Sequence, residues 1–358
     1  MYRTEILSIT NMLITELEEF CISIGEPAYR AEQILSWIYD KGVAAFDQMS
    51  NLPGDLKRKL EEKCQIFQTK IGTLIKTGDG TEKFLICLSD GNEIECVLLR
   101  EDKRVTACVS TQVGCAMACR FCASGKRGLE RNLTTGEIIE QVLHCKKHLL
   151  PNERLTNIVF MGIGEPLTNY DNVIRAVKIM NAEWGLGIGA RHITISTVGT
   201  LNGIQRLARE GLQLNLAISL HAADDITRSR IIPSNKQTGI QHILREAQKY
   251  FSITKRDISF EYTLIDGVNA SKQDAESLAR LLRNIQCNIN LLPLNPIEEF
   301  NFKPPYRETV NTFCRILKKH GLTVTVRKKK GDTINAACGQ LRLRNINFYG
   351  KNEKFFVK

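Results

Sequence analysis

The spacing of apolar residues changes repeatedly between two periods over residues 105–296. Short runs rich in Val, Ile and Leu alternate with longer stretches in which apolar residues recur every three or four positions, which predicts strands separated by amphipathic helices. The predicted strands cover 105–111, 157–165, 192–199, 214–221, 258–265 and 289–296, and the helices between them 134–148, 171–182, 201–210, 239–250 and 272–284. This alternation predicts a parallel sheet, and runs that are apolar on both faces indicate that it is buried on both sides.

Six strand–helix units leave two architectures open. They are two units short of a complete eight-fold barrel, so a partial (β/α)6 barrel and a doubly wound sheet both fit the pattern. Outside the sheet, the pattern predicts helices at 27–39 and 54–63, a small β meander at 72–99, a helix at 307–320 and a strand at 323–328. We therefore predict an N-terminal accessory domain over 1–90, an α/β core over 91–300 and a C-terminal extension over 301–358.

The composition and charge of the chain indicate which class of partner it binds and in which compartment we expect it. The chain has 43% hydrophobic and 25% charged residues, as expected of a globular protein. Its net charge of +10 and pI near 9.0 favour a polyanionic partner, although many basic proteins bind no nucleic acid. Acidic residues interrupt the first twenty positions, which excludes an apolar signal core there, and no apolar run approaches the ~20 residues of a membrane span. We expect a cytoplasmic protein.

Twelve cysteines in such a protein point to metal ligation or thiol chemistry, because cytosolic thiols are kept reduced. Cys115, Cys119 and Cys122 stand together just after the first predicted strand. Three cysteines in one loop can ligate three irons of a 4Fe-4S cubane and leave the fourth iron open for reaction. Two alternatives stay open on spacing alone. A zinc site would need further ligands that no second Cys or His pair supplies, and a Cys119-x-x-Cys122 redox pair would leave Cys115 without a role.

Polar residues follow the predicted strands where the apolar runs stop. They are Glu165, Ser196, Ser219 with His221, and Asn295. In a barrel these positions meet at the carboxyl end of the sheet, where the cysteine loop also opens. Ser196 and Asn295 could instead cap the helices that follow them. The strand-end positions nevertheless predict a site around the cysteine loop.

The common nucleotide-binding loops are absent from the sequence. In Gly162-Ile-Gly164-Glu-Pro-Leu167, leucine stands where a dinucleotide fingerprint requires its third glycine. Gly125-Lys126 is followed by Arg127 and not by the Ser or Thr of a phosphate-binding loop. The sequence therefore favours neither a Rossmann site nor a P-loop.

Taken together, the cysteine spacing and the Gly164-Glu165-Pro166 sequence resemble the radical S-adenosylmethionine (SAM) enzymes. More narrowly, residues 29–341 resemble the RlmN family, which methylates carbon 2 of adenine in 23S rRNA and tRNA. The motifs that carry this likeness are Gln112-Val-Gly-Cys115, Phe121-Cys122-Ala123, Asn132-Leu-Thr134, Met161-Gly-Ile-Gly-Glu-Pro-Leu167, Ile218-Ser-Leu-His221 and Ala336-Ala-Cys338-Gly-Gln-Leu341. Pro166 favours this family over its sibling, which methylates carbon 8 and typically has alanine at this position.

The resemblance implies a partial (β/α)6 barrel, a 4Fe-4S cluster on the three cysteines and two SAM molecules per turnover. Cys338 would accept a methyl group from one SAM, lose a hydrogen atom to the 5′-deoxyadenosyl radical from the second, and add to carbon 2. Glu95 would remove the carbon-2 proton, and Cys108 would release the product by forming a transient disulfide with Cys338. The implied SAM contacts are Gly164, Glu165, Ser196, Ser219, Leu220, His221 and Asn295.

The resemblance also implies partners. These are 23S rRNA, tRNA and an external electron donor of the flavodoxin or ferredoxin type, and we expect a monomer without membrane association. RNA contacts are expected from the N-terminal accessory domain, Lys126-Arg127 and Arg327 to Lys330, although such basic runs are often only solvated surface. The target adenine has to leave its stack to be reached. One departure from the family is Asn335, where aspartate is usual.

Two other classes of function stay open at this point. A metal-stabilised RNA-binding protein without catalysis would hold zinc and cleave no SAM. A radical enzyme that acts on a partner protein would explain the cluster, but not the pair of Cys108 and Cys338.

Overall fold

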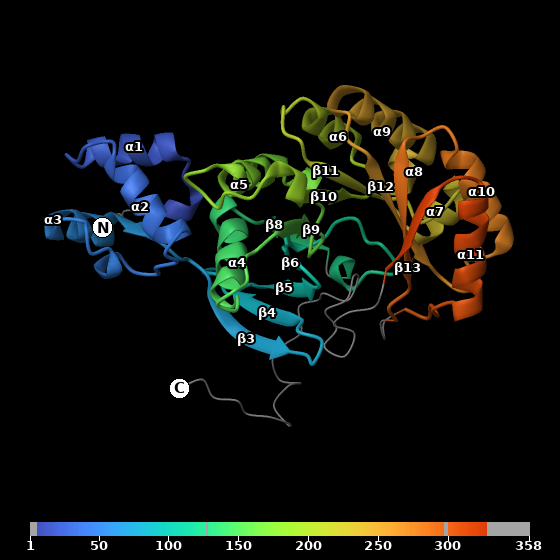
Figure 1. Ribbon diagram of the computed structural model, residues 1–358, viewed down its shortest axis with the longest axis horizontal. Coiled ribbons are helices and arrows are strands. Elements are labelled where there is room, and N and C mark those ends of the chain that lie inside the picture. Colours follow the sequence, from blue (N-terminus) through green and yellow to red (C-terminus); the bar gives the residue numbers. More distant parts are fainter. Residues whose placement is uncertain (1–5, 127, 297–299, 328–358) are drawn as a thin grey trace.

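The computed structural model describes residues 6–126, 128–296 and 300–327. Its centre is a run of parallel strands that follow one another in sequence order (Figure 1). They are β6 (Arg104–Cys108), β9 (Asn157–Phe160), β10 (Ile193–Thr197), β11 (Asn215–Ser219), β12 (Ile258–Leu264) and β13 (Cys287–Pro293), with β14 (Thr323–Val326) added beside β13. All six predicted strands are confirmed, and each ends earlier than its apolar run suggested. The residues between each observed strand end and the predicted one belong to the loops at the carboxyl end of the sheet.

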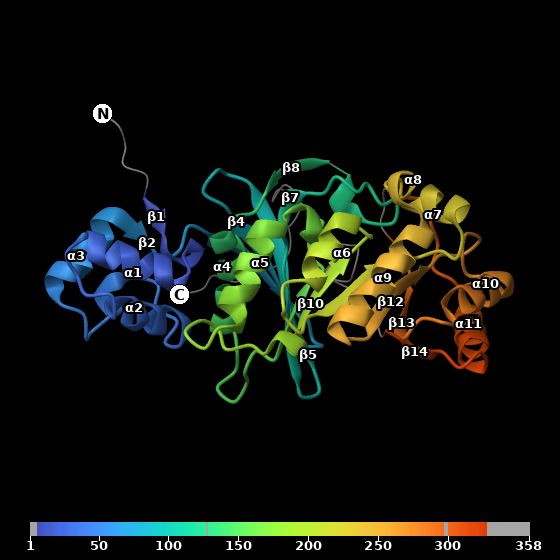
Figure 2. The same ribbon diagram turned by 90° about the horizontal axis from the view of Figure 1, so that it is seen from above.

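The strand order decides between the two predicted architectures. A doubly wound sheet reverses its strand order at one point, whereas a barrel keeps neighbouring strands consecutive. From β6 to β14 each strand of this sheet pairs in parallel with the next strand of the same sheet along the chain, and only a separate short hairpin lies between β6 and β9. The helices between the strands lie on the outer side of this curved sheet (Figures 1 and 2). The predicted partial (β/α)6 barrel is confirmed.

Amphipathic helices cover the barrel because each has one apolar face. On α5, for example, Val173, Ile174 and Val177 are buried against the sheet, and α4 begins with a capping box in which the Thr134 side chain accepts from the Glu137 backbone. The covering helices are α4 (Thr135–Lys147), α5 (Tyr170–Asn181), α6 (Leu201–Ala208), α9 (Ile240–Thr254), α10 (Lys272–Leu282) and α11 (Arg307–Lys319), with shorter helices α7 (Asp225–Ile231) and α8 (Asn235–Thr238) after β11. In the described part of the chain no helix is both long and apolar enough to span a membrane.

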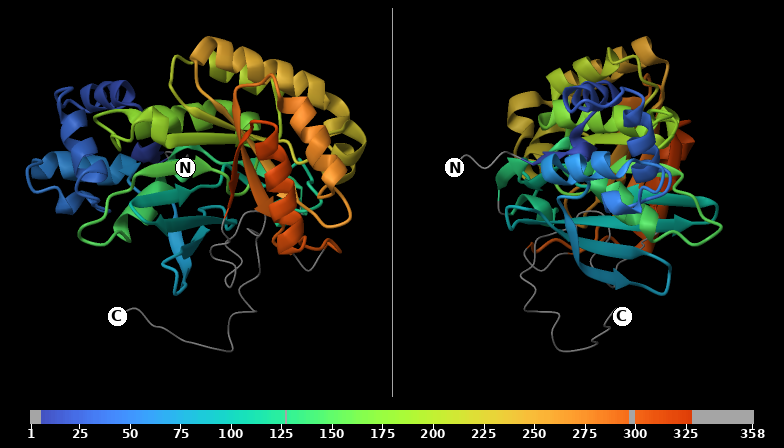
Figure 3. Two further views of the ribbon diagram at one scale, coloured as in Figure 1. Left: turned by 45° about the vertical axis from the view of Figure 1, so that its right-hand side comes forward. Right: turned by 90° about the vertical axis from the view of Figure 1, so that its left-hand side faces the viewer.

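The predicted meander continues the barrel sheet. Its strands are β3 (Lys70–Lys76), β4 (Glu82–Cys87) and β5 (Glu93–Glu101), and they pair antiparallel with one another and with β6. Figure 3 shows them, in blue-green, next to the first barrel strand. The domain boundary predicted at residue 90 falls in the turn between β4 and β5, two strands of one sheet.

Residues before the meander form a helical module at one end of the molecule (Figure 1). It contains α1 (Ile14–Ser23), α2 (Arg30–Tyr39), α3 (Gly54–Lys63) and a short parallel pair, β1 (Leu7–Ser8) and β2 (Cys64–Gln65). The helices α2 and α3 were predicted, whereas α1 was not. Only two α1 residues, Leu17 and Cys21, are fully buried, so its apolar period is weak in the sequence.

One buried carboxylate joins this module to the barrel. Glu140 of α4 is fully buried and accepts hydrogen bonds from the Thr10 hydroxyl (2.8 Å), the Gln68 amide (3.0 Å), and the amide (2.9 Å) and hydroxyl (2.7 Å) of Thr69. Thr10 follows β1 and Gln68 follows β2, so the segments after both strands of the module are fixed to the same helix of the barrel. Burial raises the pKa of Glu140 to about 7, against the effect of these donors.

We expect Glu140→Ala to lower the free energy of unfolding by about 3–5 kcal/mol, because it leaves several buried donors without an acceptor. Glu140→Gln keeps one acceptor oxygen and should cost less. Chemical denaturation measures both, with Glu276→Ala as control, since the Glu276 side chain is 42% exposed and its pair with His320 should contribute less than about 1 kcal/mol. Equal losses for Glu140→Ala and Glu276→Ala would show that Glu140 does not fix the module to the barrel.

Candidate active site

The cysteine loop starts from a short hairpin after β6. Its arms, β7 (Gln112–Gly114) and β8 (Leu129–Asn132), pair antiparallel, and the Cys115 amide donates to the Gly128 carbonyl (2.8 Å). Gly114 has φ +76°, and a Cβ there would lie 2.0 Å from the Gly128 oxygen, so only glycine fits. Ala118 also adopts a positive φ of 50°, which turns the chain between the first two cysteines. The local backbone is therefore built to hold the loop in one compact shape.

All three cysteines of the loop line one pocket. Burial raises the pKa of Cys115 to about 12 and that of Cys119 well above its usual value. In the described residues, no three His, Cys, Asp or Glu side chains converge on a point suited to a single metal ion. Thiolates on a cubane each bind a different iron and need no such point. Three thiols that open on one pocket therefore fit a 4Fe-4S cluster, which would deprotonate them by direct coordination.

The second strand ends in a glycine-rich turn that packs closely on the residues after β6. A Cβ on Gly162 would lie 2.7 Å from the backbone nitrogen of Ser110. The Ser110 hydroxyl accepts from the Ile163 amide (2.8 Å) and donates to the Glu95 carbonyl (2.6 Å). The two glycines of this turn thus let the chain after β9 approach the strands that lead into the cysteine loop.

Glu165 connects the ends of two barrel strands. Its side chain is 2% exposed, and it accepts from the Leu167 amide (3.2 Å) after β9 and from the Val198 amide (2.9 Å) after β10. Its own amide donates to the Gln112 side chain (2.9 Å) next to the cysteine loop. Burial raises the pKa of Glu165, and the hydrogen bonds that it accepts act against this. The residue holds three segments of the pocket wall in register.

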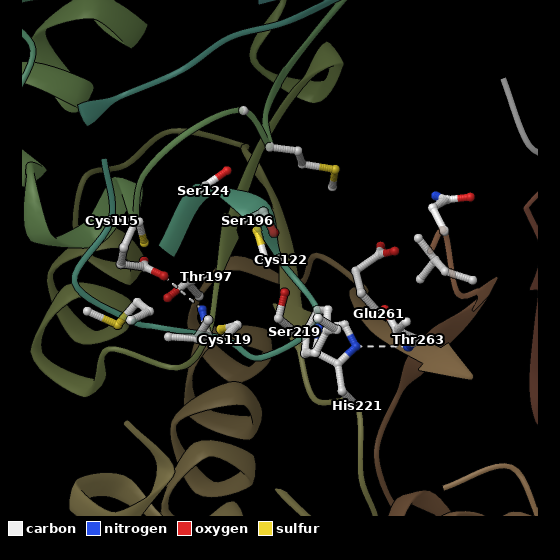
Figure 4. Close-up of a pocket in the computed structure, with 18 of the residues that line it drawn as sticks. Cys115, Cys119, Cys122, Ser124, Ser196, Thr197, Ser219, His221, Glu261 and Thr263 are labelled. Carbon is white, nitrogen blue, oxygen red and sulfur yellow. Dashed lines mark hydrogen bonds between the residues drawn. The ribbon is translucent and has the colours of Figure 1, made fainter. Parts of the chain in front are cut away.

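His221 presents a defined tautomer to the pocket. Its Nδ1 accepts a hydrogen bond from the Thr263 amide (2.8 Å), so a neutral ring carries its proton on Nε2 (Figure 4). Burial lowers the pKa of His221 to about 3, with a smaller contribution from Arg228. The ring stands edge-on to Phe121 of the cysteine loop, with centroids 4.8 Å apart. A neutral His221 therefore has only its Nε2–H left to donate a hydrogen bond.

Comparison with known proteins places this site in a family. The radical SAM superfamily matches residues 109–282, and the ribosomal RNA large subunit methyltransferase N-terminal domain matches residues 7–66. A crystal structure of a radical SAM methyltransferase from Sphaerobacter thermophilus superposes with a TM-score of 0.92 at 44% identity, covering 94% of this chain and 99% of that one. The probable dual-specificity RNA methyltransferase RlmN of Clostridium beijerinckii is 46% identical over 341 residues, 95% of this chain and 96% of the relative. That of Rhodopirellula baltica is 44% identical over 93% of this chain and 90% of the relative.

The chain belongs to the RlmN family. This membership confirms the resemblance identified from the motifs. The radical SAM superfamily implies a 4Fe-4S cluster and SAM as cofactors.

Most residues predicted for SAM binding in this RlmN family member come together around the cysteines (Figure 4). Gly164, Glu165, Ser196, Ser219, His221 and Asn295 line the same pocket as Cys115, Cys119 and Cys122. Leu220 differs, because its side chain is fully buried in the core and its amide donates to the Glu261 carbonyl (3.1 Å). The individual roles of all these residues remain predictions.

Two residues predicted for methyl transfer, Cys108 and Glu95, do not line this pocket. Cys108 packs with Val97 and Ile163 and against Met161, which itself lines the pocket. Glu95 is 4% exposed and forms an ion pair with Lys83 (2.7 Å). Two of the predicted residues, Cys338 and Asn335, and the basic residues Arg127 and Lys328 to Lys330, lie outside the described residues.

Several pocket residues were not predicted from the sequence. Glu261 and Thr263 of β12 line the pocket, as does Arg327 just after β14. Polar residues at every second position of β12 were a usable signal, because alternate strand residues face the same side of a sheet. Arg327 was assigned to a basic run, and nothing in the sequence placed it beside the barrel mouth.

Gly164→Ala should disrupt the pocket wall. Gly164 has φ +108°, and an added Cβ would lie 2.7 Å from Gln112 Cβ and 2.8 Å from Thr111 Oγ1. Backbone strain and steric clash together should destabilise the protein by about 2–4 kcal/mol. Because Gln112 holds the Glu165 amide, we also expect SAM affinity of the cluster-loaded enzyme to fall at least about tenfold, the equivalent of about 1.4 kcal/mol.

Gly187→Ala is the matched control for this substitution. Gly187 also has a positive φ of +63°, but an added Cβ would meet nothing within 4 Å. Thermal unfolding and calorimetric SAM titration of both variants separate the cost of the backbone conformation from that of the clash. If the two variants behave alike, close packing at Gly164 does not shape the pocket.

Proposed function

We propose that this chain methylates carbon 2 of adenine in 23S rRNA and tRNA. The observation that carries the proposal is the pocket at the carboxyl ends of the barrel strands, where three cysteines meet the Gly164-Glu165 turn in a chain of the RlmN family. Relatives with 44% to 48% identity are named probable dual-specificity RNA methyltransferases. Carbon 2 lies between two electron-withdrawing ring nitrogens and is a poor nucleophile, so a radical route suits it better than direct attack on a sulfonium methyl group.

Cys115, Cys119 and Cys122 would hold the cluster, and the strand ends would hold SAM. When bound and reduced, the cluster supplies the electron that cleaves SAM and yields the 5′-deoxyadenosyl radical. Gly164 and Glu165 would receive the amino end of SAM, and Ser196, Ser219 and Asn295, which line the same pocket, would contact the remainder. His221 would donate from Nε2, the nitrogen that its bond to Thr263 leaves protonated.

Three residues would carry out methyl transfer. Cys338 accepts a methyl group from a first SAM, gives up a hydrogen atom from it, and bonds through that carbon to carbon 2 of the adenine. Glu95 takes the carbon-2 proton, and the radical adduct gives up one electron, which the oxidised cluster would accept. Cys108 then attacks the Cys338 sulfur, the carbon–sulfur bond breaks, and the released carbon takes a proton to become the methyl group as the disulfide forms. Cys108 packs against Met161, which lines the pocket, so one side chain separates this thiol from the pocket. Ser110 connects the strand of Glu95 to the glycine-rich turn, because its hydroxyl donates to the Glu95 carbonyl and accepts from the Ile163 amide.

The partners follow from the same reaction. The net charge of +10 suits an RNA substrate, and we place the RNA-binding surface on the N-terminal module together with Lys126 and Arg327. A flavodoxin- or ferredoxin-like protein would reduce the cluster. We propose a cytoplasmic monomer, as RNA modification requires access to both substrates.

The decisive experiment is to load the protein with iron and sulfide under anaerobic conditions and supply SAM, a reductant and unmodified 23S rRNA or tRNA. Nucleosides from the digested RNA are then identified by mass spectrometry. We expect 2-methyladenosine in both RNAs. Formation of 8-methyladenosine would assign the chain to carbon-8 chemistry, and SAM cleavage without any RNA methylation would reject the proposed reaction.

A further inference from the structure

A fully buried arginine lies behind the cysteine loop. Arg228 of α7 has 1% of its surface exposed and is the largest side chain buried to this degree in the described structure. The helix that carries it contacts the loop directly, since the Arg120 amide donates to the Ile231 carbonyl (2.9 Å) and Cys119 packs with Ile231 and Ile232. A buried cation next to a predicted iron ligand requires an explanation, because burying an uncompensated charge costs several kcal/mol.

All hydrogen-bond acceptors of Arg228 are uncharged. Nε donates to the Leu220 carbonyl (2.9 Å), Nη2 to the carbonyls of Val198 (2.6 Å) and Ser219 (2.8 Å), and Nη1 to the Asn235 side chain (2.5 Å). The nearest acid along the network is Asp225, an exposed residue that reaches Arg228 only through Asn235, whose Nδ2 donates to Asp225 Oδ1 (2.9 Å). The guanidinium group is therefore well hydrogen-bonded, and among the described residues no carboxylate is hydrogen-bonded to it.

Arg228 lies directly behind the wall of the pocket that the cysteine loop completes. Two of its acceptors, the carbonyls of Val198 and Ser219, belong to residues that line the same pocket as Cys119. Cys119 also packs with Ile231, which lies three residues further along the helix that carries Arg228. Burial lowers the pKa of Arg228 to about 10, so the guanidinium gains from any negative charge held at this wall. A cluster held by the three cysteines would supply such charge.

We propose that Arg228 is the buried counter-charge of the iron–sulfur cluster and raises its reduction potential. The inference rests on the proposed binding of the cluster by Cys115, Cys119 and Cys122. Reduction adds one negative charge to this site, and a nearby cation in a low-dielectric interior stabilises the reduced state more than the oxidised one. Arg228 is a positioning residue in this sense, since it acts on the cluster through space and not on the substrate.

A purely structural role is the competing explanation. Arg228 ties the ends of β10 and β11 together through Val198 and Ser219, so its loss would also loosen the SAM pocket. Looser packing alone would lower the melting temperature and the SAM affinity. It would not lower the midpoint potential of the clusters that do form, because this potential does not depend on how much of the protein is loaded. The midpoint potential of the cluster separates the two roles because it responds to charge.

The experiment is an EPR-monitored redox titration of cluster-loaded protein without SAM. For Arg228→Gln we expect the reduction equilibrium constant to fall at least about tenfold, which is a shift of about 59 mV to lower potential for one electron. Arg228→Lys, which keeps the charge, should stay close to the parent. Arg230→Gln is the matched control, because Arg230 is on the same helix but exposed. An unchanged potential in iron-loaded Arg228→Gln would overturn the proposal.

If Arg228→Gln cannot be loaded with the cluster, a variant in which a negative charge is moved tests the same role of Arg228. The double variant Asp225→Asn/Asn235→Asp keeps the net charge and the hydrogen-bonding groups, but it moves the negative charge from Asp225 to the side chain that touches the guanidinium. We expect the potential to fall here too, and an unchanged potential would again reject the role. Failure of the parent protein to bind about four irons would instead reject the proposed cluster site, so the two failures are distinguishable.

Discussion

Replacement of Cys119 by alanine is expected to leave a folded protein that neither holds the 4Fe-4S cluster nor cleaves SAM. Cys119 is the middle of the three loop cysteines and is 9% exposed, packed with Ile231, Ile232 and Leu294. Removing its sulfur takes away one of only three thiolates proposed to hold the cubane, and an open-iron cluster has no spare protein ligand. The packing loss is that of one small side chain, about 1–2 kcal/mol, which a domain of this size tolerates.

Iron content, the absorption of the reconstituted protein and the yield of 5′-deoxyadenosine measure this effect. We expect iron to fall from about four per chain to less than one, and SAM cleavage to fall at least about a thousandfold. Cys314→Ala is the matched control, because Cys314 is a half-buried cysteine of α11 that does not line the pocket. Normal iron binding in Cys119→Ala would remove this cysteine from the ligand set.

The barrel could be predicted from the sequence because its strands are buried on both faces. In runs such as Ile258 to Leu264 apolar residues recur along a segment that is buried at all but one position, and this run lies between helices with a clear apolar stripe. What the pattern could not show was where the hydrogen-bonded strand ends. The residues after Phe160 continue the apolar run but form the glycine-rich turn of the site, because the Ile163 and Glu165 amides bond to the side chains of Ser110 and Gln112 and not to the backbone of a neighbouring strand.

The site could be predicted only in part, for a related reason. Polar residues at strand ends can be recognised in the sequence because they interrupt an apolar run. Glu165, Ser196 and Ser219 were found in this way. Residues that lie behind the pocket wall do not interrupt an apolar run and could not be found in this way. In the sequence, Arg228 is one of several charged residues on a short helix. Only the packing of α7 against the cysteine loop shows that its guanidinium is buried. The roles of Cys108 and Cys338 rest on family resemblance, since a buried cysteine is usually a small apolar residue.

Cys338→Ala and Cys108→Ala should both abolish product formation, but at opposite ends of the reaction. Without Cys338 no methyl group is carried to the adenine, so the cluster forms and the RNA remains unmodified and unattached. Without Cys108 the methyl carbon still bonds to carbon 2, and the reaction stops with Cys338 joined to RNA through a thioether. Cys108 is 8% exposed on β6 and packs with Val97 and Ile163, so alanine should leave the strand intact.

Denaturing gel electrophoresis with labelled RNA distinguishes the two variants. We expect a protein–RNA adduct only with Cys108→Ala, at a yield approaching one per chain, and it should survive thiol reductants because a thioether is not cleaved by disulfide exchange. Cys96→Ala is the matched control. Cys96 is a buried cysteine on the neighbouring strand β5, its sulfur 3.8 Å from that of Cys145, and its loss should leave methylation intact without any adduct. If Cys108→Ala forms no adduct yet methylates no RNA, the release step does not belong to Cys108. If it methylates normally, another thiol frees the product, and the arrangement of Cys108 behind Met161 serves packing alone.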